Sequence, residues 1–129
     1  MTFAKRVYLV AGIYGLAVLL PQYFLVEKNG RDFPPPITHV EYYYGFVGIA
    51  VAWQIAFLLI SRDPARYRPL MLATIVEKAA FAIPAFLLYA QGRLSVSMLG
   101  AGTLDAVLGV LFAVSYVKTS GAATGSLGR

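Results

Sequence analysis

Four long runs of apolar residues, separated by short polar segments, dominate the pattern of this chain. They cover residues 7–26, 42–60, 70–90 and 94–117. Each run has the length of about 20 residues that a helix needs to cross the hydrocarbon core of a bilayer. Because the connections are short, the pattern predicts an all-α integral membrane fold, a four-transmembrane-helix up-down bundle that forms one domain over residues 1–118.

Lysine and arginine are unevenly distributed between the two ends of the predicted bundle. One end collects Lys5, Arg6, Arg62, Arg66, Arg68, Lys118 and Arg129, and the other collects only Lys28, Arg31 and Arg93. Basic residues that flank membrane spans favour the cytoplasmic side. We therefore expect both termini to be cytoplasmic. The first run lacks the small-residue cleavage motif of a signal peptide, so we expect it to be retained as a span.

The segment between the first two runs combines a turn signal with a proline run. Asn29-Gly30 predicts a turn, and Pro34–Pro36 predicts an extended polyproline stretch. At the other end of the chain, residues 119–129 are rich in Gly, Ser, Ala and Thr, and they predict a disordered cytoplasmic tail.

The basic connection between the second and third runs predicts one turn at the membrane surface. It starts at Ser61, and Asp63-Pro64 has the form of a helix start. We expect the arginines of this turn to contact anionic lipid head groups. They are Arg62, Arg66 and Arg68.

Composition supports the membrane class and excludes several kinds of site. The 129 residues are 59% hydrophobic and 13% charged, with a mean hydropathy of +0.68. A soluble domain has about a quarter charged residues. The chain has no cysteine and one histidine, so we expect no metal centre and no cofactor. In a membrane protein the net charge of +5 indicates topology, and we expect no nucleic-acid partner.

A small set of polar residues interrupts the apolar runs. Glu77 and Lys78 lie in the third run, Asp105 in the fourth and Gln54 in the second. An ionisable residue near the bilayer centre costs roughly 2.5–3.5 kcal/mol on insertion scales, which makes such residues candidates for a functional site. At ~1.5 Å per residue, Glu77 and Gln54 lie at similar depth on the cytoplasmic side, and Tyr14 of the first run lies at the same level.

The chemistry of these side chains predicts one ion pair. The long stem of Lys78 can reach Asp105 across the two helices. Glu77 and Lys78 point about 100° apart on a helix, so we do not expect them to pair. Glu77 is left to Gln54, Tyr14 or water, or it carries a proton. The cluster is either a structural clasp or a ligand site, and no spacing in it identifies a catalytic residue.

Small residues follow one face of the second run and predict a contact surface. The stripe lies opposite Gln54, so if Gln54 faces the bundle interior the stripe either faces outward or packs edgewise against a neighbouring helix. An outward stripe of this kind is a candidate homodimer face or partner face. Its members are Gly45, Gly48, Ala52 and Ala56.

In its helix plan the chain resembles the small four-helix bacterial inner-membrane proteins grouped as DoxX-like. The resemblance covers the four spans and the cytoplasmic ends, and it implies a multi-pass protein of the inner (plasma) membrane. The stretch from Trp53-Gln54 through residues 62–69 to Glu77-Lys78 also has the look of a family signature, without an activity attached.

Three functions fit these observations. The first is a non-enzymatic accessory or assembly subunit that contacts lipids and a membrane partner. The second is a binder or carrier of a small lipophilic or cationic molecule that uses Glu77 and Asp105, for which the four-span proteins of the emopamil-binding type provide a precedent. The third is a lipid-modifying enzyme of isomerase type.

Overall fold

The computed structural model describes residues 2–127, with side chains through Thr119, and its helices confirm the all-α prediction. No strand occurs among residues 2–127. The elements are α1 (Phe3–Leu19), the 3-10 helix η1 (Leu20–Phe24), α2 (Val26–Asp32), α3 (Val40–Arg62), α4 (Arg68–Ala90) and α5 (Val96–Leu127).

Four segments are long and apolar enough to cross a membrane, as the hydrophobic pattern predicts. They are Phe3–Phe24, Val40–Arg62, Arg68–Ala90 and Val96–Thr119. Helices α1, α3 and α4 begin before the predicted apolar runs, and these extensions include charged residues such as Lys5, Glu41 and Arg68. The first run is shorter as an α-helix than predicted, because α1 ends at Leu19 and the next five residues form η1. At the start of α1, the Thr2 hydroxyl accepts a hydrogen bond from the Lys5 amide and caps the helix.

The backbone of α5 is helical as far as Leu127. Its last part overlaps residues 119–129, for which the composition predicts disorder. That disorder stays a prediction, and residues 128–129 and the side chains from Ser120 onward lie outside the described part of the chain.

The predicted turn at Asn29-Gly30 is wrong, because both residues lie inside α2. Asn-Gly favours a turn where it connects two strands, and here it lies in a helical segment. The Asn29 side chain donates to Gln22 Oε1 and to the Tyr43 hydroxyl, both at 2.8 Å, which fixes α2 against η1 and α3. The proline run that follows has bends at residues 33–35 and a cis bond between Pro34 and Pro35.

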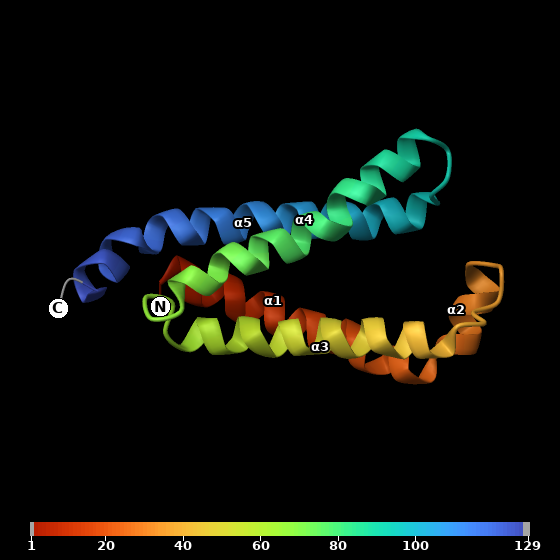
Figure 1. The fold of residues 1–129 in the computed structure, drawn as a ribbon, viewed down its shortest axis with the longest axis horizontal. Coiled ribbons are helices and arrows are strands. Elements are labelled where there is room, and N and C mark those ends of the chain that lie inside the picture. Colours follow the sequence, from red (N-terminus) through yellow and green to blue (C-terminus); the bar gives the residue numbers. More distant parts are fainter. Residues whose placement is uncertain (1, 128–129) are drawn as a thin grey trace.

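The helices alternate in direction and form two pairs. Figure 1 shows α1 beside α3 and α4 beside α5. The pairs meet at the end that holds the start of α1 and the α3–α4 turn, which we call the basic end, and they diverge toward α2 and the α4–α5 turn.

The core lies near the basic end, where all four long helices contribute aromatic or large apolar side chains. Tyr8 stacks on Phe112 with ring centroids 4.3 Å apart, and Phe57 packs edge-on against both rings. Met71 and Ile60 are buried beside them. These contacts join the two helix pairs at one end only.

Two glycines allow close approach within the pairs. A Cβ on Gly15 of α1 would collide with the Gln54 side chain of α3. In the other pair, a Cβ on Gly102 of α5 would lie 2.6 Å from Cβ of Ala85 on α4, closer than two carbons can approach. A small residue at a helix contact allows the two backbones to approach closely, as in tightly packed membrane helices.

Candidate functional site

An ionic triad lies between the middle parts of α4 and α5. Lys78 Nζ is 3.5 Å from Asp105 Oδ1, and it donates a hydrogen bond to this oxygen. The predicted ion pair between α4 and α5 is therefore present. Close approach of the helices supports it, because a Cβ on Gly109 of α5 would lie 3.3 Å from Lys78 Cβ.

Glu77 also belongs to the triad, which corrects the expectation that neighbouring side chains would not pair. Lys78 Nζ is 3.5 Å from Glu77 Oε1, the same distance as from Asp105. The Cα–Cβ bonds of residues 77 and 78 diverge on the helix, but the flexible four-carbon stem of lysine brings its ammonium group between the two carboxylates. The angle between two residues around the helix axis therefore does not determine whether a lysine side chain can pair with its neighbour.

The three members of the triad differ in burial. The Lys78 side chain is 7% exposed, whereas those of Glu77 and Asp105 are 21% and 22% exposed. Lys78 Nζ also lies 5.3 Å from the ring centroid of Phe57, which places the ammonium beside the aromatic core. Within the described side chains, Glu77 Oε1 accepts no hydrogen bond although it is buried. The two carboxylates are thus more accessible than the ammonium that they share.

Asp105 forms part of the wall of a groove of about 350 Å³ between α4 and α5. Apart from Asp105, the lining side chains are apolar or small. They are Ile75, Ala79, Ala82, Ile83, Phe86, Ala106, Gly109, Val110 and Ala113. The surface of the groove is therefore almost entirely apolar, with the Asp105 carboxylate at its edge and Glu77 outside it.

Gln54 and Tyr14 occupy positions away from the triad. Gln54 is 4% exposed, donates to the Ala50 carbonyl of its own helix at 3.0 Å and packs over Gly15 of α1. Tyr14 is 48% exposed, and within the described side chains its hydroxyl forms no hydrogen bond. The common depth of these residues stays a prediction, and depth along a helix does not determine which neighbour a side chain faces.

The small-residue stripe of α3 faces outward, as expected from the inward position of Gln54. Gly45 has open space where a Cβ would be, and Gly48 has only the Tyr23 hydroxyl nearby, at 3.6 Å. Ala52 is exposed and Ala56 is half-buried.

The three arginines of the α3–α4 turn have different surroundings. Arg62 and Arg66 are exposed, and the Arg66 guanidinium lies 5.7 Å from the Tyr67 ring centroid. Arg68 is half-buried, donates from Nε to the Tyr116 carbonyl at 3.0 Å and stacks 3.5 Å from the ring centroid of Tyr116. Arg68 therefore fastens the start of α4 to α5. Lipid contact by this turn stays a prediction.

One polar contact between the helix pairs was not predicted. The Tyr8 hydroxyl of α1 and the Thr74 hydroxyl of α4 are 2.7 Å apart, and Thr74 also donates to the Met71 carbonyl at 2.7 Å. Tyr8 therefore donates to Thr74. Tyr8 and Thr74 lie similar numbers of residues from the ends of α1 and α4 at the basic end, so counting residues along these two helices could have predicted that their hydroxyls lie at similar depth.

Comparisons of the chain with protein-family models, curated proteins and solved structures found no match. The resemblance to DoxX-like proteins stays a prediction. In the part of the chain that the structure describes, no group of three or more His, Cys, Asp or Glu side chains is placed to hold a metal ion.

Proposed function

We propose that this small multi-pass membrane protein binds an amphiphilic organic cation within the bilayer. Asp105 and Glu77 supply the anionic part of the site, and the groove between α4 and α5 supplies its apolar part. The observation that carries the proposal is the position of a single ammonium, that of Lys78, 3.5 Å from each of two carboxylates.

Charge balance favours a cationic ligand. When all three groups are ionised, two carboxylates and one ammonium leave one negative charge in excess. An uncompensated charge in a low-dielectric environment is costly, by several kcal/mol on common estimates. The triad therefore gains stability by taking up one positive charge, either as a proton or as a bound cation.

Accessibility favours a cation over an anion. Lys78 is covered by Phe57 and by its two partners, with only 7% of its side chain exposed. A ligand that approaches the triad reaches the more exposed carboxylates first. An anion would meet them as repelling charges, whereas an ammonium group can pair with Asp105.

The groove indicates the remaining chemistry of the ligand. Its apolar lining favours an alkyl or ring system, and its position on the outer surface of two candidate spans gives access from the acyl-chain region. Its volume of about 350 Å³ lies within the ~300–1,000 Å³ of small-molecule pockets. A lipophilic amine meets both requirements, since its charge pairs with Asp105 and its body covers the groove.

The test uses Trp53, the single tryptophan of the chain, whose ring lies 6.5 Å from that of Phe57. A brominated alkylamine is titrated into nanodiscs of uncharged lipid that hold the protein, and quenching of Trp53 is followed. We expect saturable quenching that weakens at least tenfold in Asp105→Asn, since a hydrogen bond to a charged group contributes about 1.5–3 kcal/mol.

Controls separate this site from general partitioning into the bilayer. Asp32→Asn removes an exposed carboxylate outside the candidate spans and should leave quenching unchanged. A brominated alcohol with the same chain should quench without saturation. Equal saturable quenching by the alcohol, or an unchanged curve for Asp105→Asn, would refute cation binding at the triad.

A second candidate function, an accessory or assembly subunit, is favoured by the outward small-residue stripe of α3. Open space at Gly45 and near Gly48 allows another helix to approach.

In membranes, Gly48→Leu should abolish cross-linking of two copies or capture of a partner. Gly100→Leu on α5, which also lies in open space, is the matched control and should have no effect. Retained cross-linking in Gly48→Leu would exclude this surface.

A further inference from the structure

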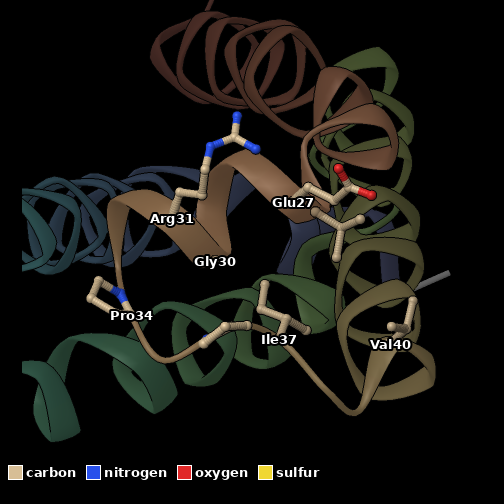
Figure 2. Close-up of a pocket in the computed structure, with 8 residues that line it drawn as sticks. Glu27, Gly30, Arg31, Pro34, Ile37 and Val40 are labelled. Atoms are coloured by element: carbon tan, nitrogen blue, oxygen red, sulfur yellow. The ribbon is translucent and has the colours of Figure 1, made fainter.

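A cup of about 630 Å³ lies beside α2, at the end of the molecule opposite the basic end. Figure 2 shows α2 on one side of the cup, the loop that carries Pro34 and Ile37 around it, and the start of α3 at Val40 closing it. Val26 and Pro36 complete the apolar lining, and Glu27 and Arg31 of α2 lie at the rim. The cup is thus apolar inside and charged at its edge.

The cup is held in shape by hydrogen bonds and by one close backbone approach. The Tyr43 hydroxyl of α3 donates to the Gln22 carbonyl at 2.7 Å, and Asn29 of α2 donates to both Gln22 and Tyr43. Gly30 is buried, and a Cβ on it would lie 3.2 Å from the Pro36 Cα and the Ile37 amide nitrogen. The loop therefore passes tightly beneath α2, and a ligand would find the cup already formed.

The charges at the rim are unpaired, in contrast to their neighbours. Glu27 and Arg31 are four residues apart on one face of α2, yet neither forms an ion pair within the described side chains. One position further along, Lys28 and Asp32 do pair, with Nζ 2.5 Å from Oδ2. The cup thus presents a free carboxylate and a free guanidinium about one helical turn apart.

The cup lies at the level where two candidate spans end. The first span ends at Phe24 and the second begins at Val40. Exposed aromatic side chains surround this level, with Phe24 87% and Tyr42 70% exposed. Aromatic rings of this kind concentrate at the boundary between acyl chains and head groups.

We propose that the cup binds a zwitterionic phospholipid with a primary ammonium in its head group. Arg31 pairs with the phosphate, because a guanidinium matches phosphate oxygens in two parallel hydrogen bonds. Glu27 accepts hydrogen bonds from the ammonium. The upper part of an acyl chain covers Val26, Ile37 and Val40. This site is separate from the triad and does not depend on the proposed cation binding.

The test measures how much lipid the purified, delipidated protein retains in native mass spectrometry. Phosphatidylethanolamine, phosphatidylcholine and phosphatidylglycerol with the same acyl chains are offered in turn. We expect phosphatidylethanolamine to be retained best, since a quaternary amine cannot donate to Glu27 and a glycerol head group has no positive charge. Equal retention of all three lipids by the unmodified protein would overturn the proposal.

Variants assign the two charges separately. Arg31→Gln should lower retention of every phospholipid about fivefold, the effect of losing one partly exposed charge pair. Glu27→Gln should lower phosphatidylethanolamine to the level of phosphatidylcholine and leave phosphatidylglycerol unchanged. Lys28→Gln and Asp32→Asn remove the same charges from the same helix and should have no effect. A loss as large in these two controls would show general charge attraction and overturn the site.

The role of the apolar cup is tested independently. Ile37→Trp fills the cavity and should lower retention of all three lipids, with helicity checked by circular dichroism. Soluble phosphoethanolamine, offered as a competitor, should displace phosphatidylethanolamine poorly because it lacks the chain. Displacement at equal concentration would contradict chain binding in the cup. Asp105→Asn should leave lipid retention unchanged, so failure of the triad proposal and failure of this one are distinguishable.

Discussion

The α1–α3 pair and the α4–α5 pair bury polar side chains in different ways. In α1–α3, Gln54 is satisfied by a carbonyl of its own helix and fills the space above Gly15. In α4–α5, Lys78 reaches across to Asp105 and back to Glu77. An amide can be satisfied by the backbone carbonyl four residues earlier, whereas a charge needs an opposite charge. This difference between an amide and a charged group explains why Gln54 bonds within its own helix and does not join the triad.

The comparison predicts that loss of the ammonium has the largest effect on stability. Lys78→Met leaves two largely buried carboxylates between α4 and α5 without a counter-charge, which should destabilise the fold by about 3–5 kcal/mol. Gln54→Leu loses only one hydrogen bond within its helix and should cost ~1 kcal/mol or less. Both are measured by denaturation in mixed detergent micelles, with circular dichroism as the readout.

A second variant checks the cause of that effect. Adding Glu77→Gln to Lys78→Met removes one of the two uncompensated carboxylates and should recover part of the lost stability. If Lys78→Met is no more harmful than Gln54→Leu, the two helix pairs do not differ in the way described above.

Close packing in the α1–α3 pair gives the next largest effect. Gly15→Val places a side chain where Gln54 now lies, and overpacking of this kind costs about 1–3 kcal/mol. Adding Gln54→Ala should recover most of the loss, because it empties the same space. Gly100→Val has open space around it and is the control, with an expected effect within ~0.5 kcal/mol. The same denaturation experiment measures the unfolding free energy of Gly15→Val, of Gly15→Val with Gln54→Ala, and of Gly100→Val. If the double variant loses as much stability as the sum of its two single substitutions, Gly15 and Gln54 are not in direct contact.

The hydrophobic pattern was sufficient to predict the four long apolar helices that are candidate spans, because membrane-length apolar runs have few alternatives. The contact of Lys78 with Asp105 could also be predicted, since a buried charge must find a partner. The neighbours of Gln54 and Tyr14 could not, because depth along a helix leaves its rotation and its partner helix undetermined. The helical state of Asn29-Gly30 was also beyond local rules, since a tertiary contact of the Asn29 side chain accompanies it.

The smallest predicted effect concerns the hydrogen bond that joins the two pairs. Tyr8→Phe keeps the ring that stacks on Phe112 and removes only the bond to Thr74, whose own donation to Met71 remains. A hydrogen bond between membrane helices contributes about 0.6 kcal/mol on average, so we expect a loss of that size in the denaturation experiment. Ser115→Ala removes a buried hydroxyl that bonds within its own helix and should cost less. If Ser115→Ala costs as much as Tyr8→Phe, the hydrogen bond across the pairs has no special weight, and the buried apolar and aromatic contacts of the core hold the pairs together.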